Sequence, residues 1–456
     1  MELATKELIN VDEPNLYEDI FDFDSVPLIK FDGKVYEEID GQVVEFDPAE
    51  AMKRDIFITD TTFRDGQQAR PPYTVEQTVK LYDMIARLGG TKGVIRWTEF
   101  FLYNVKDRKA VEGCLELGHK FPLVTGWIRA NKGEFKLVTD MGLVETGMLS
   151  SCSDYHIFYK LRSNRQEIMD QYLGMVDHAI SSGVRVRCHL EDVTRADIDG
   201  FVIPFVQRVM DKADQAPEEL KPRIRLCDTL GFGISYPGAA LPRSIPKLVY
   251  KMIHECGVPH DRLEWHGHND FHKVHINAST AWLYGCNAVN ATLFGIGERT
   301  GNPPLEGAIF EYMGLKGDGN GIDTRIITEI ADYYTNEIGV ELPAHYPFVG
   351  KNFNVTRAGI HADGLAKHEY VYNIFNTTKL LGKPPRVAIT DKSGVDGVAL
   401  WVNNFLGEDE KVSRKGIARI ARWVRNQYDE EGRNTAISNE EMEEQTRKYL
   451  PEHFTD

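Results

Sequence analysis

Residues 263–291, LEWHGHNDFHKVHINASTAWLYGCNAVNA, contain one full repeat of the pattern that decides the fold. An apolar run of strand length begins at Leu263, a stretch at helical period covers residues 273–284, and the next strand-length run begins at Ala288. The same alternation predicts strands that begin near Ile56, Gly93, Leu123, Val144, Val184, Ile224, Leu263 and Ala288. Eight strand-then-helix units over about 260 residues indicate an α/β fold of the (β/α)8 TIM barrel type, with a doubly wound sheet as the alternative.

We expect three regions along the chain. Residues 1–54 form an acidic appendage, since residues 1–50 hold 15 acids and 3 bases. Its short β-like runs are separated by Asp-Gly pairs at 32–33 and 40–41, which predicts a three-stranded meander that includes residues 26–31. Residues 55–320 form the barrel. Residues 321–456 are predicted to be mainly helical, with an apolar stripe at Ile417, Ile420, Ala421 and Val424 that packs into a core.

Composition narrows the class of protein. No run of about 18 apolar residues is present, so we expect no membrane span. A formal charge of −16 opposes nucleic acid or anionic lipid as a partner. The six cysteines form no C-x-x-C pair, which argues against a disulfide framework or a zinc knuckle. The N-terminal residues lack the pattern of a secretory signal, and we expect a cytoplasmic protein.

A barrel predicts that functional side chains follow the strands, because the C-terminal strand ends meet at one face. Polar segments occur at these places. They are residues 60–68, 127–129, 189–192, 228–231, 266–270 and 295–302.

His266 and His268 are the strongest candidates for a metal site. Residues two apart in a strand share a face, so both imidazoles can bind one cation, although two polar residues at a strand end are the simpler interpretation of the tripeptide alone. Asp65 follows the first strand and Asn302 ends the glycine-rich segment 295–302, hereafter the glycine loop. Both residues can add oxygen ligands. Nitrogen and oxygen donors with open positions favour Mn²⁺ or Mg²⁺ over a closed structural Zn²⁺.

Arg64 adjoins Asp65 and has two interpretations. It forms a salt bridge with Glu191 or Asp192 at the barrel mouth, or it stabilises an oxyanion on a substrate, which is the role we favour. The glycine loop has the spacing G-x-G-x-x-x-G, which is not the dinucleotide-binding pattern, and Glu298 and Arg299 are expected to brace its turn.

Seven motifs occur in one order and together resemble one family. They are Arg64-Asp65-Gly66-x-Gln68, Ser153-Asp154-x-His156 with Tyr159-Lys160-Leu161, Glu191-Asp192-x-Thr194-Arg195, Asp228-Thr229-x-Gly231, residues 266–270, Gly295-x-Gly297-Glu298-Arg299-x-Gly301-Asn302 and residues 358–364. The chain resembles the isopropylmalate synthase and homocitrate synthase family of metal-dependent acyl-CoA condensing enzymes over about residues 55–395.

The resemblance implies condensation of acetyl-CoA with a 2-oxo acid, which chelates a metal bound by Asp65, His266 and His268, with Asn302 at or near the cation. It implies acid and base roles for Glu191, His361 and Tyr372, a place for Arg64 near the enolate, and substrate binding by Gln68, Arg129 and Thr229. It also implies a homodimer, in which the segment carrying His361 reaches the neighbouring barrel. From the residues alone, His361 is more typical of a loop histidine.

Departures from the family bear on the 2-oxo acid. Gln67 replaces the acidic residue or Asn that is usual between Gly66 and Gln68, and residues 97–101 differ from the usual Gly-Phe-Pro segment. Only about 60 residues follow Gly394, so the feedback domain of isopropylmalate synthases is missing. In these features the chain is most similar to Re-specific citrate synthases, which use oxaloacetate and release CoA. Homocitrate, isopropylmalate and citramalate synthesis, cleavage of a 3-hydroxyacyl-CoA, and a non-catalytic scaffold are the alternatives.

Overall fold

The computed structural model describes residues 13–407 and 412–454, which divide into two compact units. One unit is Lys30–Pro343, and the other combines Met1–Ile29 with Ala344–Asp456. Each unit is described below by itself.

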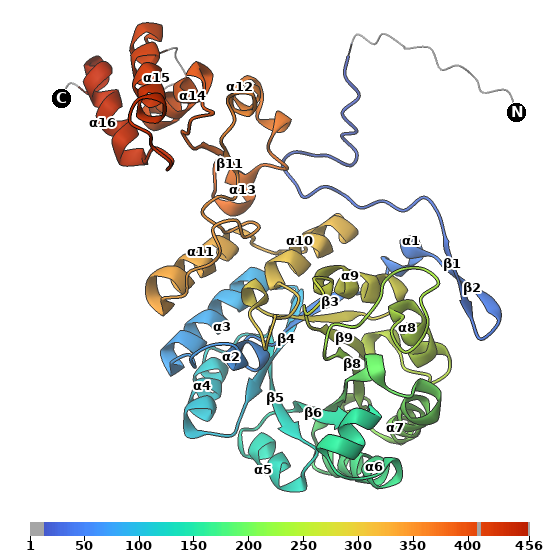
Figure 1. Cartoon of the computed structure of the whole chain (residues 1–456). Helices are drawn as coiled ribbons and strands as arrows, with labels where there is room; N and C mark the ends of the chain where they lie inside the picture. Colours follow the sequence, from blue (N-terminus) through green and yellow to red (C-terminus); the bar gives the residue numbers. More distant parts are fainter. Residues whose placement is uncertain (1–12, 408–411, 455–456) are drawn as a thin grey trace, which may run out of the picture. The chain divides into compact units, whose positions relative to one another are not determined.

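Eight parallel strands of the larger unit close into a barrel (Figure 1). The strands are β3 (Phe57–Asp60), β4 (Ile95–Phe101), β5 (Leu123–Arg129), β6 (Glu145–Ser151), β7 (Arg185–Glu191), β8 (Arg223–Asp228), β9 (Leu263–Gly267) and β10 (Ala288–Ala291). The barrel closes where β10 pairs with β3, with Ala288 opposite Phe57. This closure confirms the predicted TIM barrel and excludes the doubly wound sheet, which has two open edges.

Helices follow the strands and surround the barrel (Figure 1). They are α3 (Val75–Gly89), α4 (Val105–Glu116), α5 (Lys132–Asp140), α6 (Arg165–Ser181), α7 (Ile203–Gln215), α8 (Ile245–His254), α9 (Val274–Tyr284) and α10 (Leu305–Lys316), with the short α2 (Asp65–Gln68) after β3 and α11 (Arg325–Tyr333) after α10. Local sequence sets several of their starts. Thr74 and Gln77 form a capping box at α3, and Ser244 caps α8, which has Pro246 in its first turn.

The barrel interior contains charged side chains as well as apolar ones. Glu99 of β4 accepts hydrogen bonds from Arg187 at 2.9 Å and from Arg225 at 3.1 Å, and all three side chains are fully buried. Arg225 also donates to Glu264 at 2.8 Å. Burial would raise the pKa of Glu99, but Arg225 and its other cationic neighbours hold that pKa well below its usual range. These buried charges are therefore paired.

Residues 13–54 of the N-terminal appendage form two strands instead of the predicted three. β1 (Val35–Ile39) and β2 (Gln42–Phe46) form an antiparallel hairpin, followed by α1 (Pro48–Ala51). Residues 26–31 form no strand, and Pro27 cannot donate the hydrogen bond that a strand there needs. The hairpin is attached to the barrel by Asp40, which pairs with the buried Lys251 at 2.6 Å.

The other unit is mainly helical. Its elements are β11 (Val355–Thr356), α12 (Gly359–Lys367), α13 (Thr377–Leu381), β12 (Arg386–Val387), α14 (Val395–Leu406), α15 (Arg414–Asp429) and α16 (Asn439–Tyr449). The stripe at Ile417, Ile420, Ala421 and Val424 is buried in one hydrophobic cluster with residues of α14 and α16, as predicted.

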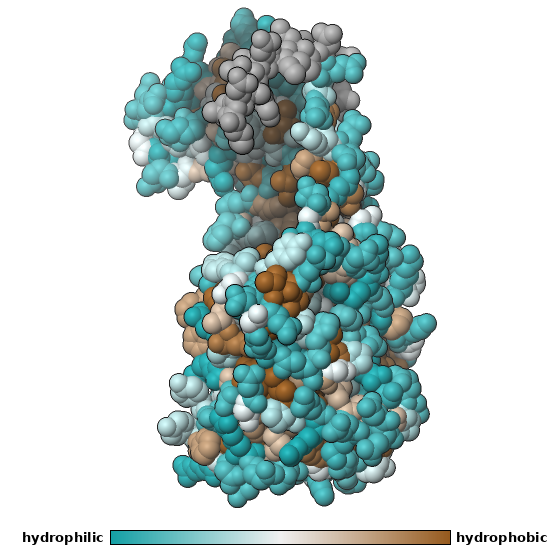
Figure 2. Space-filling view, turned by 90° about the vertical axis from the view of Figure 1, so that its right-hand side faces the viewer, coloured by the Kyte–Doolittle hydropathy of each residue, from teal (hydrophilic) through white to brown (hydrophobic). Residues whose placement is uncertain are grey.

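The face drawn in Figure 2 is mainly hydrophilic, with hydrophobic side chains in small groups. No helix in the described part of the chain is long and apolar enough to cross a bilayer.

Candidate metal and substrate site

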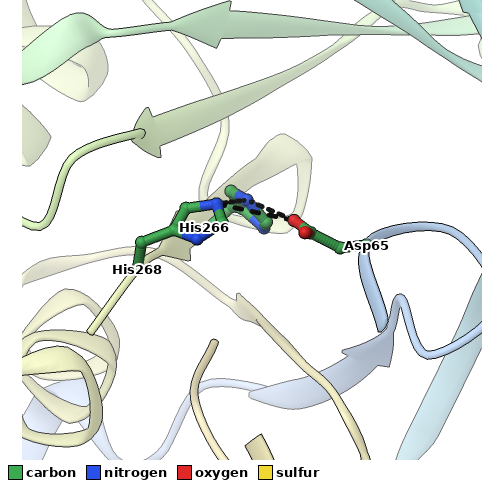
Figure 3. Close-up of side chains that lie close together, drawn as sticks. All are labelled: Asp65, His266 and His268. Carbon is green, nitrogen blue, oxygen red and sulfur yellow. Dashed lines mark hydrogen bonds and ion pairs between the residues drawn. The ribbon is translucent and has the colours of Figure 1, made fainter. Parts of the chain in front are cut away.

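Asp65, His266 and His268 converge at the C-terminal end of the barrel strands (Figure 3). Asp65 begins α2, directly after β3, and the two histidines lie at and just beyond the end of β9. The Asp65 Oδ2 atom is 3.3 Å from His266 Nε2 and 3.5 Å from His268 Nε2, and the two Nε2 atoms are 3.3 Å apart. Donor atoms at this spacing, from three buried residues, can all bind one cation.

The proton on His266 is fixed by a neighbour on the next strand. Asn290 of β10 accepts a 2.7 Å hydrogen bond through Oδ1 from His266 Nδ1, and it donates through Nδ2 to Thr59 at 2.7 Å. Thr59 in turn donates to the buried carboxylate of Glu264. A proton on Nδ1 leaves the Nε2 lone pair of His266 directed at the cluster, as a metal ligand requires.

Asn302 reaches the same cluster through its amide nitrogen. The Nδ2 atom donates to Asp65 Oδ2 at 3.3 Å and to the Gly267 carbonyl at 3.0 Å. The Oδ1 atom is buried without a hydrogen-bond partner among the described residues. A Cβ added to Gly297 would lie 1.8 Å from this oxygen, so any larger residue at that position would displace the Asn302 amide. In this geometry Asn302 orients the Asp65 carboxylate.

Charge in the cluster suits a divalent cation. Burial would raise the pKa of Asp65, but Arg64 and the two histidines hold it well below its usual range. Burial lowers the pKa of His268 to about 4, and Asp65 opposes that shift only in part. At neutral pH the cluster therefore presents a carboxylate and a neutral His268 imidazole, the protonation states that metal binding needs.

Arg64 forms ion pairs with Glu99 and Asp65, so the predicted alternative of a salt bridge to Glu191 or Asp192 is wrong. Its Nε donates to Glu99 at 2.8 Å and its Nη1 donates to Asp65 at 3.2 Å. The Nη2 atom has no hydrogen-bond partner among the described residues. This arrangement keeps one pair of guanidinium protons available to an anionic group at the site.

Glu191, at the end of β7, contacts the side chains of Lys160, His156 and Ser151. Lys160 donates to both of its oxygens, at 2.8 and 2.7 Å, and His156 Nδ1 is 3.0 Å from Oε2. Ser151 also donates to Oε2. Burial would raise the pKa of Glu191, but His156 and Lys160 lower it to about 2.

The three predicted substrate-binding residues have different surroundings. Thr229, after β8, accepts a 2.8 Å hydrogen bond from the Asp192 backbone N–H, and its carbonyl accepts from Arg299. Gln68 is exposed on α2. Arg129 is exposed at the end of β5 and donates to Glu134 at 2.7 Å through Nε.

The loop after β10 contacts neighbouring segments through the Glu298 backbone and the Arg299 side chain, so only Arg299 braces the turn with its side chain. The Glu298 backbone N–H donates to Asp65 Oδ1 at 3.2 Å, and Arg299 donates to Asp270 at 3.1 Å. Arg299 thereby ties the loop to the segment that follows the histidine pair.

His361 and Tyr372 lie together in the smaller unit. Both side chains are exposed, and their ring centroids are 4.4 Å apart. His361 belongs to α12, and Tyr372 follows the short helix Glu369–Val371.

Two residues of the site were not singled out from the sequence. Glu99 holds Arg64, and Asn290 holds His266. Each is a polar side chain inside an apolar strand-length run, and such a residue signals an inward-facing functional group. That signal was present in residues 95–101 and 288–291.

Comparisons with known proteins show the family to which the chain belongs. The family model described as HMGL-like matches residues 55–333. The chain is 54% identical over 452 residues to the Citrate (Re)-synthase of Syntrophus aciditrophicus, which covers 98% of this chain and 70% of that protein. It is 49% identical over 449 residues to the Citrate (Re)-synthase of Clostridium kluyveri, with 98% and 96% covered.

More distant relatives share less of the sequence. A 2-isopropylmalate synthase from Caldanaerobacter subterraneus is 30% identical over 361 residues, covering 78% of this chain and 86% of that protein. Among solved structures, hydroxymethylglutaryl-CoA lyase from Pseudomonas aeruginosa aligns with a TM-score of 0.50 at 19% identity, covering 63% of this chain and 94% of the other. That similarity establishes a common barrel fold.

Proposed function

Because this chain belongs to the HMGL-like family, we propose that it is a Re-type citrate synthase, which condenses acetyl-CoA with oxaloacetate and hydrolyses the thioester with water, giving citrate and CoA. The observation that carries the proposal is the near full-length similarity to two proteins named Citrate (Re)-synthase. The overlap reaches beyond the barrel into the helical unit, so it includes the segment with His361 and Tyr372.

We propose that Asp65, His266 and His268 bind the divalent metal, with Asn302 beside it. Two imidazole nitrogens, a carboxylate and an unpartnered amide oxygen are donors that Mn²⁺ or Mg²⁺ accepts, and Zn²⁺ is the alternative ion. When bound, such an ion acts as a Lewis acid on the ketone of the 2-oxo acid.

The remaining steps are assigned to side chains of this chain. The Nη2 protons of Arg64 face no protein acceptor, so they can stabilise the enolate oxygen that forms when a methyl proton leaves acetyl-CoA. Thr229 binds the carboxylate of the 2-oxo acid, and Gln68 and Arg129 contribute further substrate contacts. To bind substrate, the Arg129 guanidinium must give up part of its hydrogen bonding with Glu134.

Acid and base chemistry is assigned to Glu191, His361 and Tyr372. His361 and Tyr372 are exposed and adjacent, near the exposed apolar residues Ile360, Tyr370 and Ile374. An exposed catalytic pair among apolar side chains is explained if this surface meets another subunit. We therefore propose a homodimer in which each helical unit completes its partner's barrel site.

The experiment that tests the function is a thiol-release assay with purified protein, acetyl-CoA, Mn²⁺ and a panel of 2-oxo acids. Oxaloacetate is expected to give the highest kcat/KM, with citrate as the product. Equal or better turnover with 2-oxoglutarate, 2-oxoisovalerate or pyruvate would instead assign homocitrate, isopropylmalate or citramalate synthesis. Release of acetyl-CoA from a 3-hydroxyacyl-CoA would assign the lyase.

We also infer a cytoplasmic location. All six cysteines are buried free thiols, which is typical of proteins from reducing compartments.

A further inference from the structure

A long loop joins β8 to α8 at the C-terminal face of the barrel. It consists of residues 229–244, whereas connections of about two to six residues are usual between a strand and a helix. A Cβ added to Gly231 would lie 2.7 Å from the His268 carbonyl oxygen. The ring centroids of Phe232 and Phe271 are 5.4 Å apart. The loop therefore packs against the segment that follows the histidine pair and borders the candidate metal site.

Hydrogen bonds fix the first part of this loop. The Gly233 backbone N–H donates to the Asp228 carboxylate at 2.9 Å, and the Gly233 carbonyl accepts from Asn277 at 3.1 Å. Arg243 Nε donates to the Phe232 carbonyl at 2.8 Å. The backbone at these two loop residues is therefore held on the barrel.

Residues 235–241, hereafter the rim segment, have fewer attachments. Among the described residues outside the loop, the rim segment forms hydrogen bonds only with Glu37. The Gly238 backbone N–H donates to both carboxylate oxygens of Glu37, at 3.2 and 3.0 Å. The Tyr236 side chain is 60% exposed, and Lys273 Nζ lies 5.1 Å from its ring centroid. Glu37 thus holds the backbone of the rim segment.

Glu37 comes from the N-terminal hairpin, which is fixed to the barrel by other contacts. β1 lies beside α8 (Figure 1). Asp40, at the hairpin tip, pairs with Lys251 at 2.6 Å. The ring centroids of Phe46 and Tyr284 are 4.6 Å apart. These contacts do not involve the Glu37 side chain, so the hairpin stays attached without its carboxylate.

The Glu37 side chain is an unusual group for its position. The residue is 2% exposed and forms no ion pair with any described residue. Removing a carboxylate from water costs free energy, which one backbone N–H offsets only in part. Ile39 lies on the same face of β1 and is apolar, as attachment alone requires. A carboxylate at position 37 therefore indicates a requirement to hold Gly238.

We propose that Glu37 is a positioning residue of the substrate site, which holds the rim segment over the barrel mouth so that this segment closes on the bound 2-oxo acid. The inference rests on the proposed condensation, because that reaction supplies the 2-oxo acid. The same loop begins with Thr229, the residue proposed to bind the carboxylate of that acid. A loop that is held in its bound conformation loses less conformational entropy when substrate binds, which lowers KM. Glu37 acts through Gly238 and does not touch substrate.

The simpler explanation is that Glu37 only attaches the hairpin. Attachment predicts that loss of the carboxylate lowers the stability of the protein and leaves KM unchanged. Positioning predicts the reverse, because an apolar side chain can fill the same space in the hairpin but cannot accept the hydrogen bond from Gly238.

The test is steady-state kinetics on the full-length protein with Glu37→Leu, Glu37→Gln and Asp40→Asn. Glu37→Leu should raise KM for the 2-oxo acid by about 10-fold and change kcat by less than about threefold, because the lost interaction is equal in the ground and transition states. Glu37→Gln keeps an acceptor oxygen and should restore KM to within about threefold of wild type. Asp40→Asn, which weakens the other charged contact of the hairpin, is the matched control and should keep the wild-type KM. If Glu37→Leu does not fold, Glu37→Ala replaces it.

Hydrogen–deuterium exchange gives a readout that does not need turnover. In Glu37→Leu, peptides covering residues 234–241 should exchange at least about 10-fold faster than in wild type, because the Gly238 N–H loses its acceptor. Peptides covering residues 35–46 should exchange as in wild type. Oxaloacetate, or the 2-oxo acid that wild type turns over in its place, should slow exchange of the wild-type rim segment when it is added with Mn²⁺ and without acetyl-CoA.

Two kinds of result would overturn the inference. One is a wild-type KM in a folded Glu37→Leu protein, or an equal rise of KM in Asp40→Asn, either of which would assign attachment alone. The other is wild-type exchange of the rim segment in Glu37→Leu, or no effect of the 2-oxo acid on that exchange in wild type. Absence of condensation with every 2-oxo acid in wild type would refute the proposed function alone, because the exchange comparison between the ligand-free proteins stands without it.

Discussion

At the scale of single residues, His266 depends on Asn290 for its tautomer and the Asp65 carboxylate on Asn302 for its orientation. Asn290 Oδ1 accepts a hydrogen bond from His266 Nδ1, with 2.7 Å between the two atoms. Asn302 Nδ2 donates to Asp65 Oδ2 at 3.3 Å. Such supporting residues tune metal affinity without touching the ion.

Asn290→Ala is expected to weaken Mn²⁺ binding by about 10- to 100-fold, because His266 then loses the hydrogen bond that presents its Nε2 lone pair. Isothermal titration calorimetry on the metal-free protein measures the change. Asn320→Ala, which removes a 2.9 Å hydrogen bond to Tyr312 and no hydrogen bond of the cluster, is the control and should bind as wild type does. Equal affinity in Asn290→Ala would mean that the tautomer is set elsewhere.

Arg64→Lys is expected to lower kcat by about 100-fold or more while metal binding and fold persist. The guanidinium reaches Glu99 through Nε and Asp65 through Nη1 and still presents Nη2, whereas one ammonium group cannot satisfy all three directions. Steady-state kinetics measures the change in kcat, and a Mn²⁺ titration on the same sample shows whether metal binding has changed. A variant with wild-type kcat would remove Arg64 from the oxyanion role.

At the scale of elements, strands and long helices were predictable and short irregular turns were not. The predicted strand starts lie within two residues of the observed ones, as for Val144 against β6 at Glu145 and Gly93 against β4 at Ile95. The π-helical turn Tyr155–Lys160 has no sequence pattern of its own, since it differs from an α-helical turn only in that its hydrogen bonds span five residues instead of four. Residues 26–31 had a strand-like composition, but Pro27 removes a backbone donor.

The N-terminus of α16 gives a pH-dependent prediction. Arg433 and the Ser438 backbone lower the pKa of Glu441 to about 2, and Glu441 completes a capping box with Ser438. A lowered folded-state pKa contributes stability that is present above the unfolded value near 4.5 and is lost as pH falls towards 2. Glu441→Gln should therefore lower the thermal midpoint at pH 7, and the difference from wild type should shrink between about pH 4.5 and pH 2.

Thermal unfolding followed by circular dichroism at several pH values measures this difference. Glu444→Gln, on the same helix but exposed, is the matched control and should show no such pH dependence. A constant difference across the range would exclude the Arg433 pair as its source.

At the scale of the whole molecule, the proposed dimer makes a complementation test possible. Asp65→Asn removes a proposed metal ligand of the barrel and His361→Ala removes a proposed acid or base of the helical unit, so each homodimer should be inactive. If the helical unit completes the partner's barrel, co-expression should restore about 25% of wild-type activity, because half of the dimers then have one intact site. Mixing Asp65→Asn with His266→Ala, both barrel lesions, should restore none. No recovery in the first mixture, with dimers present by light scattering, would contradict the shared site.

The sequence alone predicted that Asp65, His266 and His268 lie together, because barrel topology brings strand ends together regardless of their separation along the chain. It did not predict the Glu99 contact with Arg64. Between β3 and β4 the register shifts, so that Ile58 faces Ile95 while Thr59 faces Trp97. A shift of this kind changes which residues of neighbouring strands lie opposite each other, so residues 95–101 signal an inward-facing Glu99 but not its contact with Arg64.

The shared carboxylate of Glu99 also limits how this barrel can change over evolutionary time. Arg64, Arg187 and Arg225 all pair with this one residue, so replacing it alone would leave three buried cations short of a counter-charge. Removing one partner of a buried ion pair typically costs about 3–5 kcal/mol, a large share of the stability of a typical domain. A change of 2-oxo acid specificity should therefore arise more readily by substitution at the exposed barrel rim, where Arg129 and Gln68 lie, than by substitution in the buried barrel interior. A substitution of Glu99 in the barrel interior should be accompanied by substitutions of the arginines that pair with it.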